Sequence, residues 1–256
     1  EEFMAKWSQL EVRFTKGHSH GYFHGNPDYP VKYLKTVQHF YFENKNGVIT
    51  PASNNPTAIR WEGSNDEAGV SLSGIELIFY DKEGKRINSL LTTGQAPNHY
   101  QFFFIADNFT AVASNTTVPT QAEALDYKYR DTNPEELYIK GGSFDKNPNA
   151  PKGVLRQEQI GLKGFFEVKR TYINFDLRIV LGLFASKPAN LTYNTVPANK
   201  VLDVKIPIHI YTDLLREDKT VEDAVREFGV SKEEIEKDQN DILSSNLSPE
   251  SSGTFL

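Results

Sequence analysis

The sequence predicts a mainly β protein, an antiparallel β-sandwich that forms one large unit or two lobes, with a short C-terminal helical hairpin. Two observations support this fold class. Aromatic residues make up 12% of the 256 residues, and most are Phe or Tyr, which favour half-buried pleated surfaces. Apolar and polar residues also alternate with a period of two along most of the chain, whereas helical spacing is confined to residues 217–243.

The first part of the chain, residues 1–140, is expected to form an N-terminal β lobe. Strands are expected over residues 10–14 and onward towards 18, 38–43, 74–80, 85–91, 99–107, 125–130 and 137–140. The clearest hairpin joins 74–80 to 85–91, because the turn between them ends in Gly84. Asn and Gly in residues 44–47 predict a second tight turn, after which Val48 begins a return strand.

A segment rich in Gly, Asn, Pro and Lys, residues 141–153, is expected to separate this lobe from a second one. The second β lobe or sheet is expected over residues 154–216, with strands at 164–172, 174–184 and 201–211. Thr220 and Ser231 each begin a capping sequence and Gly229 ends the first helix, so two helices are expected within 217–243. Residues 244–256 are expected to form a flexible tail.

Composition limits the partners and the kinds of site. The formal net charge is −6, so the chain as a whole does not attract phosphate, and nucleic acid is not an expected partner. The chain has no Cys, and therefore a metal site must use nitrogen and oxygen ligands.

A cluster of three histidines is the feature that best indicates chemistry. His18, His20 and His24 are three of the six histidines and fall within seven residues, framed by glycines. Side chains two apart on a strand share a face, so His18 and His20 are expected to project together. His24 has the same parity if the chain stays extended, and the glycines could otherwise bend the backbone and bring it round to the same ion. The cluster predicts a metal site for Zn or Cu(II), with haem as an alternative.

Other side chains are candidates to complete the metal shell. His39 is the preferred fourth ligand, because the segment before it is short enough to return the next strand beside the first. Asp28 and Glu43 are nearby carboxylates that could bind the ion or orient an imidazole. His99 and His209 are more typical of structural histidines.

The polar β composition, rich in Asn, Thr and Tyr, and the acidic start Glu1-Glu2 resemble mature surface lipoproteins of Bacteroidota-type bacteria that act in metal or haem uptake. This resemblance implies an exported protein of the periplasm or outer-membrane surface, held to the membrane only by a lipid anchor. It also implies an outer-membrane uptake receptor as a partner. Together with the histidines, it predicts a protein that captures a transition-metal ion or haem for uptake.

Two alternatives stay open. One is a structural or carbohydrate-binding β module of the cell surface without metal, in which aromatic residues such as Trp7, Trp61 and Tyr100 stack on sugars. The other is a metal-dependent hydrolase. The chain has no His-Glu-x-x-His, Gly-x-Ser-x-Gly or phosphate-loop motif, so no catalytic residue and no enzyme activity are predicted.

Overall fold

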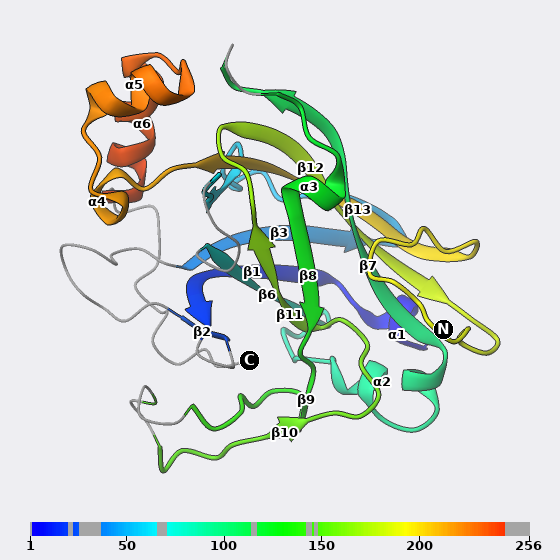
Figure 1. Cartoon of the computed structure of the whole chain (residues 1–256). Helices are drawn as coiled ribbons and strands as arrows, with labels where there is room; N and C mark the ends of the chain where they lie inside the picture. Colours follow the sequence, from blue (N-terminus) through cyan, green and yellow to red (C-terminus); the bar gives the residue numbers. More distant parts are fainter. Residues whose placement is uncertain are drawn as a thin grey trace.

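The structure is a computed structural model that describes residues 2–19, 23–25, 37–65, 71–113, 117–141, 145 and 148–243. Strands make up 43% of it and helices 17%, and antiparallel sheets pack in a sandwich-like arrangement (Figure 1). The predicted mainly β class and the short C-terminal helices are therefore confirmed.

The larger sheet has seven strands in the order β4-β3-β1-β6-β11-β8, with β2 paired to β1. Its strands are β1 (Gln9–Ser19), β2 (Phe23–Gly25), β3 (Val37–Lys45), β4 (Val48–Pro51), β6 (Leu72–Tyr80), β8 (Leu125–Tyr129) and β11 (Lys163–Val168). The described strand pairs of this sheet are antiparallel, and the predicted turn before Val48 is present, with positive φ at Asn46 and Gly47.

The smaller sheet has four strands in the order β5-β13-β12-β7. They are β5 (Ile59–Glu62), β7 (Tyr100–Ala111), β12 (Ile173–Leu183) and β13 (Lys200–Tyr211), and only the pairing of β5 with β13 is parallel. A separate two-stranded ribbon pairs β9 (Thr132–Asn133) with β10 (Val154–Leu155).

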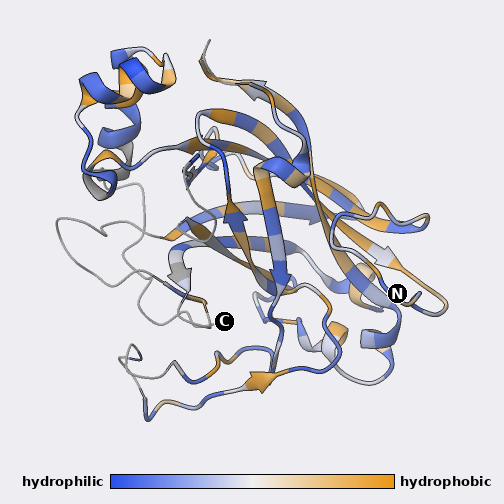
Figure 2. Ribbon diagram, viewed as in Figure 1, coloured by the Kyte–Doolittle hydropathy of each residue, from blue (hydrophilic) through white to orange (hydrophobic). Residues whose placement is uncertain are grey.

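Alternating side chains from both sheets form one main core. Hydrophobic residues alternate with hydrophilic ones along the strands (Figure 2), as expected for strands with one face turned to a core. Aromatic rings from the two sheets contact each other. The ring centroids of Phe14 of β1 and Trp61 of β5 are 6.0 Å apart, and those of Phe79 of β6 and Phe102 of β7 are 5.9 Å apart. We call the core-facing side of the larger sheet its inner face and the opposite side its outer face.

The two predicted lobes are interleaved in space. Strand β11, from the predicted second lobe at 154–216, lies between β6 and β8 of the first. Strands β5 and β7, from residues 1–140, likewise belong to the sheet of β12 and β13. Both segments therefore contribute to both sheets and to the same main core.

The hairpin expected over residues 74–91 is wrong in its second half. Strand β6 forms as predicted, but its return is a single bridge between Tyr80 and Arg86, and residues Ser89–Thr92 form helix α2. The buried Asn88 side chain accepts from the Phe79 backbone N–H at 2.9 Å and donates to the Leu77 carbonyl at 2.9 Å. It satisfies backbone groups of β6 that a return strand would otherwise pair.

Residues 137–140, expected as a strand, have no strand assignment. The Leu137 carbonyl instead accepts from Lys163 Nζ at 2.8 Å and from Thr132 Oγ1 at 2.6 Å. Several short elements were not predicted from the sequence pattern, among them α1 (Glu2–Lys6), β5, η1 (Ala96–Asn98), α3 (Gln121–Ala124) and α4 (Leu214–Glu217).

The C-terminal helices are α5 (Val221–Phe228) and α6 (Lys232–Leu243), and they lie together at one corner of the molecule (Figure 1). Thr220 and Asp223 form the predicted capping box, and Gly229 ends α5 with φ 67°. The expected tail, residues 244–256, lies outside the described residues. Among the described residues, no helix is long and apolar enough to cross a membrane.

Candidate functional site

Strand β1 carries His18 into a short antiparallel pair with β2, where its direct partner is His24. The chain therefore reverses between Ser19 and Phe23, and His24 returns against His18 rather than following it along one strand. Residues directly opposite in an antiparallel pair have Cβ atoms about 4.5–5.5 Å apart and on one face. Of the two arrangements expected for His24, the structure has the one in which the chain comes back.

Gly17 explains why β2 lies where it does. A Cβ at this position would lie 2.2 Å from the His24 carbonyl oxygen and 2.7 Å from the Phe23 ring. The same ring closes over Gly74 of β6, and it stacks on Phe165 of β11 at 5.5 Å. Gly17 thus lets a fully buried Phe23 hold β2 against the outer face.

His24 is only 3% exposed. Successive side chains of a strand point to opposite faces, and Phe23 lies on the outer face, so His24 lies on the inner face. Lys16, two positions before His18 on β1, contacts two carboxylates at this end of the sandwich. Its Nζ lies 2.8 Å from Asp213 Oδ2 and 3.2 Å from Glu62 Oε2.

The pKa of Lys16 follows from this arrangement. Burial lowers it, but the charges of Tyr211, Glu62 and Asp213 and the hydrogen bond to Asp213 outweigh burial and raise it above its ordinary value. Lys16 therefore stays protonated and in contact with the two carboxylates at neutral pH.

The structure does not bring His39 to the other predicted ligands. His39 pairs with Arg13 on the outer face, whereas His24 belongs to the inner side, so the sheet itself separates them. Its Nδ1 lies 2.9 Å from Glu11 Oε2. Strand β3 returns beside β1 as expected, but its register puts His39 opposite Arg13, an outward residue of β1.

The other candidate ligands lie elsewhere. Glu43 is opposite Gln9, at the far end of β1 from His18. His99 contacts the Phe184 carbonyl through Nδ1 at 2.9 Å. His20 and Asp28 lie outside the described residues.

Within the side chains that the structure describes, no group of three or more His, Cys, Asp or Glu is arranged to hold a metal ion. The side chains of His18 and His20 are not among them. Of the predicted ligands, the backbone pairing of β1 and β2 brings two together, His18 and His24. Both are histidines, and imidazole nitrogen suits Zn and Cu(II).

A charged network on the outer face was not predicted. Glu11, 6% exposed, accepts from Tyr80 Oη at 2.9 Å and contacts Arg13 as well as His39. Burial raises the pKa of Glu11, but the hydrogen bonds from His39 and Tyr80 and the charge of Arg13 lower it to about 2. From the alternation of apolar and polar residues alone, the side chains of this network would be expected to face solvent.

The same network holds residues 131–141 against the sheet. Tyr138 donates to Glu76 Oε1 at 2.8 Å, and Arg86 Nε donates to Glu135 Oε1 at 2.7 Å. Lys163 of β11 donates to the carbonyl oxygens of Glu135 and Leu137. Each of these contacts joins residues that are far apart in the sequence. Together they attach residues 131–141 to the rest of the fold.

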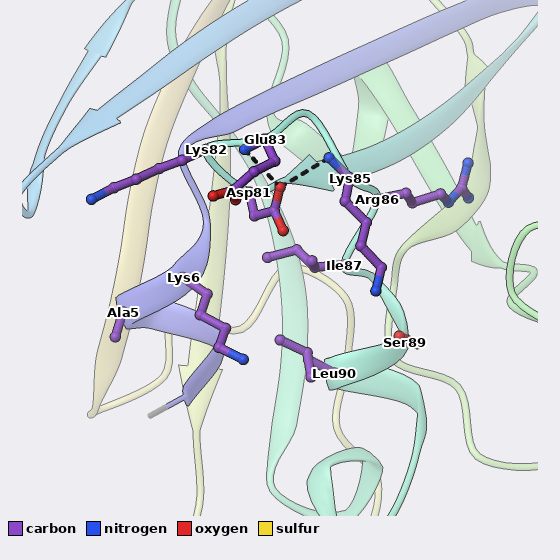
Figure 3. A pocket seen from close by; sticks show the side chains of 10 residues that line it. All are labelled: Ala5, Lys6, Asp81, Lys82, Glu83, Lys85, Arg86, Ile87, Ser89 and Leu90. Atoms are coloured by element: carbon purple, nitrogen blue, oxygen red, sulfur yellow. Dashed lines mark hydrogen bonds between the residues drawn. The ribbon is translucent and has the colours of Figure 1, made fainter.

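A cavity of about 460 Å³ lies between α1 and the turn after β6 (Figure 3). The Asp81 carboxylate accepts from the backbone N–H groups of Glu83 and Lys85, and Arg86 is paired with Glu135. Asp81 and Arg86 therefore serve the local fold. The remaining lining combines charged side chains, such as Lys82, with apolar ones, such as Leu90.

Comparison with known proteins gave no match to a family model, to a curated protein or to a solved structure.

Proposed function

We propose that the protein binds a divalent transition-metal ion, Zn or Cu(II), through His18 and His24, with His20 as a further ligand, and captures it for uptake at a cell surface. The observation that carries this proposal is the direct pairing of positions 18 and 24 across the ladder of β1 and β2. A hydrogen-bonded ladder fixes the spacing of two residues, so little conformational freedom is lost when both bind one ion.

The surroundings also support a cation. His24 is buried, so water competes poorly for its ring. Two carboxylates, Glu62 and Asp213, lie around Lys16, which is on the same side of the sheet as His24. Carboxylates near a bound histidine commonly raise its affinity for the metal.

A free ion fits this pair better than a haem bound by two histidines. Residues opposite each other in a ladder, with Cβ atoms about 5 Å apart, suit adjacent positions around one ion. Ligands on the two faces of a haem must instead approach its iron from opposite sides.

A capture role is proposed because the chain has a nitrogen-donor cluster without a recognisable catalytic motif beside it. Export to the periplasm or outer-membrane surface, a lipid anchor and an uptake receptor belong to the same proposal. If protein ligands fill the coordination shell, no position is left for an activated water, which separates capture from hydrolysis.

The test is calorimetric titration of the protein with Zn²⁺ and with Cu²⁺. His18→Ala and His24→Ala should each weaken binding by about tenfold or more, because each removes a ligand. His39→Ala is the matched control, since it removes a histidine of the same sheet from the opposite face and should leave affinity unchanged. Equal affinity in the wild type and in the double variant of His18 and His24 would reject the proposal.

A second variant tests the geometry without removing a ligand. Gly17→Ala puts a methyl group where the His24 carbonyl and the Phe23 ring lie, so β2 must move away from β1. Metal affinity should fall although all histidines remain, and circular dichroism should still show a β-rich fold. Affinity should also fall as the pH is lowered through about 6.5, because a protonated imidazole cannot bind a metal.

A further inference from the structure

A second cavity, of about 550 Å³, lies at the end of the sandwich opposite the histidines. It opens at the start of β7, whose Phe102 stacks on Phe79, the partner of Leu10 at the beginning of β1. Its lining residues come from four separate parts of the chain, residues 98–101, Tyr129, residues 158–159 and residues 186–191. We call this cavity the β7 cleft.

Lys187 lies at the centre of the polar wall. Its Nζ donates to Gln101 Oε1 at 3.0 Å and to Glu158 Oε1 at 3.2 Å, and its side chain is 11% exposed. Burial lowers the pKa of Lys187, whereas its contact with Glu158 acts in the opposite direction. The ammonium and carboxylate groups balance each other's charge, so the lining of the cleft carries no net charge at neutral pH.

Hydrogen bonds to neighbouring residues fix the side chains that line the cleft. Gln101 is 6% exposed, and Tyr129 donates its hydroxyl to the Phe102 carbonyl at 2.6 Å, which fixes the ring. The Gln159 amide accepts from the Asp131 backbone N–H at 2.6 Å and donates to the Asp131 carbonyl at 3.1 Å. A site whose polar groups are already positioned loses little entropy when a ligand binds.

The Asp131 carboxylate fixes the neighbouring loop. It accepts from the backbone N–H groups of four consecutive residues, Ile160, Gly161, Leu162 and Lys163. This buried carboxylate lies behind the cleft and keeps Glu158 and Gln159 on a loop with a fixed course.

We infer that the β7 cleft binds a neutral polyhydroxyl ligand of the saccharide class. Hydroxyl groups both donate and accept, and the wall offers both kinds of partner in the ammonium of Lys187, the carboxylate of Glu158 and the hydroxyl of Ser186. Tyr129, Pro188 and Leu191 supply apolar surface for the C–H groups of a sugar ring. The volume lies within the range of small-ligand sites, roughly 300–1,000 Å³.

A charged ligand fits the cleft less well. An anion attracted by Lys187 meets the Glu158 carboxylate, and a cation attracted by Glu158 meets the Lys187 ammonium. The aromatic residues that the sequence suggested for sugar stacking are not available, since Trp7, Trp61 and Tyr100 are at most 6% exposed and belong to the main core.

The test is binding of the intact protein to glucose, galactose, maltose, cellobiose and chitobiose, measured by saturation-transfer NMR and calorimetry. Glucuronate, an anion, and glucosamine, a cation when protonated, serve as charged counterparts. At least one neutral sugar should bind, and Lys187→Met and Gln101→Ala should each weaken binding by about tenfold or more. Lys82→Met, a lysine of the other hollow, is the control and should have no effect.

Glu158→Gln is a second variant for the case that a buried substitution disturbs folding, because its side chain is 49% exposed. It should also weaken sugar binding while circular dichroism stays unchanged. The inference is overturned if no neutral sugar in the panel binds, if binding survives in the three cleft variants, or if a charged counterpart binds more tightly. Zn²⁺ affinity should be unaltered in Lys187→Met, so failure here is distinguishable from failure of the metal proposal.

Discussion

Glu11 is a buried carboxylate whose ionised form depends on neighbours from three strands. It accepts from His39 of β3 and Tyr80 of β6 and lies 3.2 Å from Arg13 of its own strand. Burial disfavours the charge of Glu11, and its pKa is nevertheless lowered from 4.5 to about 2 by these partners. The hydrogen bonds therefore outweigh the cost of removing the carboxylate from water.

Glu11 should make stability depend on pH in the acid range. Its pKa is lower in the folded protein than in the unfolded chain, so its contribution is fully present above about pH 4.5 and is lost as the pH falls towards 2. Denaturant unfolding at several pH values should show this loss, about 3 kcal/mol at most from this group. Glu11→Gln should be less stable at pH 7 and should lack this part of the acid dependence.

Glu43→Gln is the matched control for removing one carboxylate from the same sheet, because Glu43 is 44% exposed and lies 3.7 Å from Lys45. It should change stability at pH 7 by less than about 1 kcal/mol. If Glu11→Gln and the wild type lose stability in parallel below pH 4.5, the assignment of this dependence to Glu11 is wrong.

At the scale of elements, helix α6 is attached to the smaller sheet by one buried carboxylate. Asp238, 1% exposed, accepts from His209 Nε2 at 2.9 Å and from Arg60 Nε at 3.1 Å. The other ring nitrogen of His209 contacts Asn174 Oδ1 at 2.7 Å. His209 therefore joins β12, β13 and α6.

Removing Asp238 should loosen the C-terminal helices. Asp238→Ala removes this acceptor from two partly buried nitrogen donors, on His209 and Arg60, which should cost about 1–3 kcal/mol. Hydrogen exchange measured by mass spectrometry should become faster over residues 214–243 and change little in the strands. Glu236→Ala on the same helix, whose carboxylate lies 3.7 Å from Lys232, should leave exchange unchanged; equal exchange in both variants would contradict this role.

At the scale of the whole molecule, the two sheets share one main core that draws on residues before and after 141–153. Strand β11 fills the gap between β6 and β8, and without it β6 would have an unpaired edge. Strands β5 and β7 have no partner in the described structure other than β13 and β12. Neither part of the chain can therefore bury its apolar faces alone.

Separate expression of residues 1–140 and 154–243 should give two chains that do not fold. Each should lack dispersed amide signals in a two-dimensional NMR spectrum, and coexpression should restore them as the shared core forms. A native-like spectrum from residues 1–140 alone would contradict this prediction and favour two independent lobes.

Much of the local structure could be predicted from the sequence, because it depends on near neighbours. Alternation located β1, β3, β6, β7, β12 and β13, and capping residues located α5 and α6. Thr220 caps its own helix through Asp223, three residues away, and Gly229 ends it through its own φ. Such signals fail where a distant side chain intervenes, as Asn88 does in place of a return strand.

The sites show the same division. The sequence alone determined that the chain is mainly β, that it has no thiolate ligand and that three histidines are close together in it. Only the tertiary structure decided that His24 returns opposite His18 and that His39 faces the other way. It alone brought Gln101, Glu158 and Lys187 together. The physical reason is that sheet register is set by burial of apolar faces between strands far apart in the chain, which no local pattern encodes.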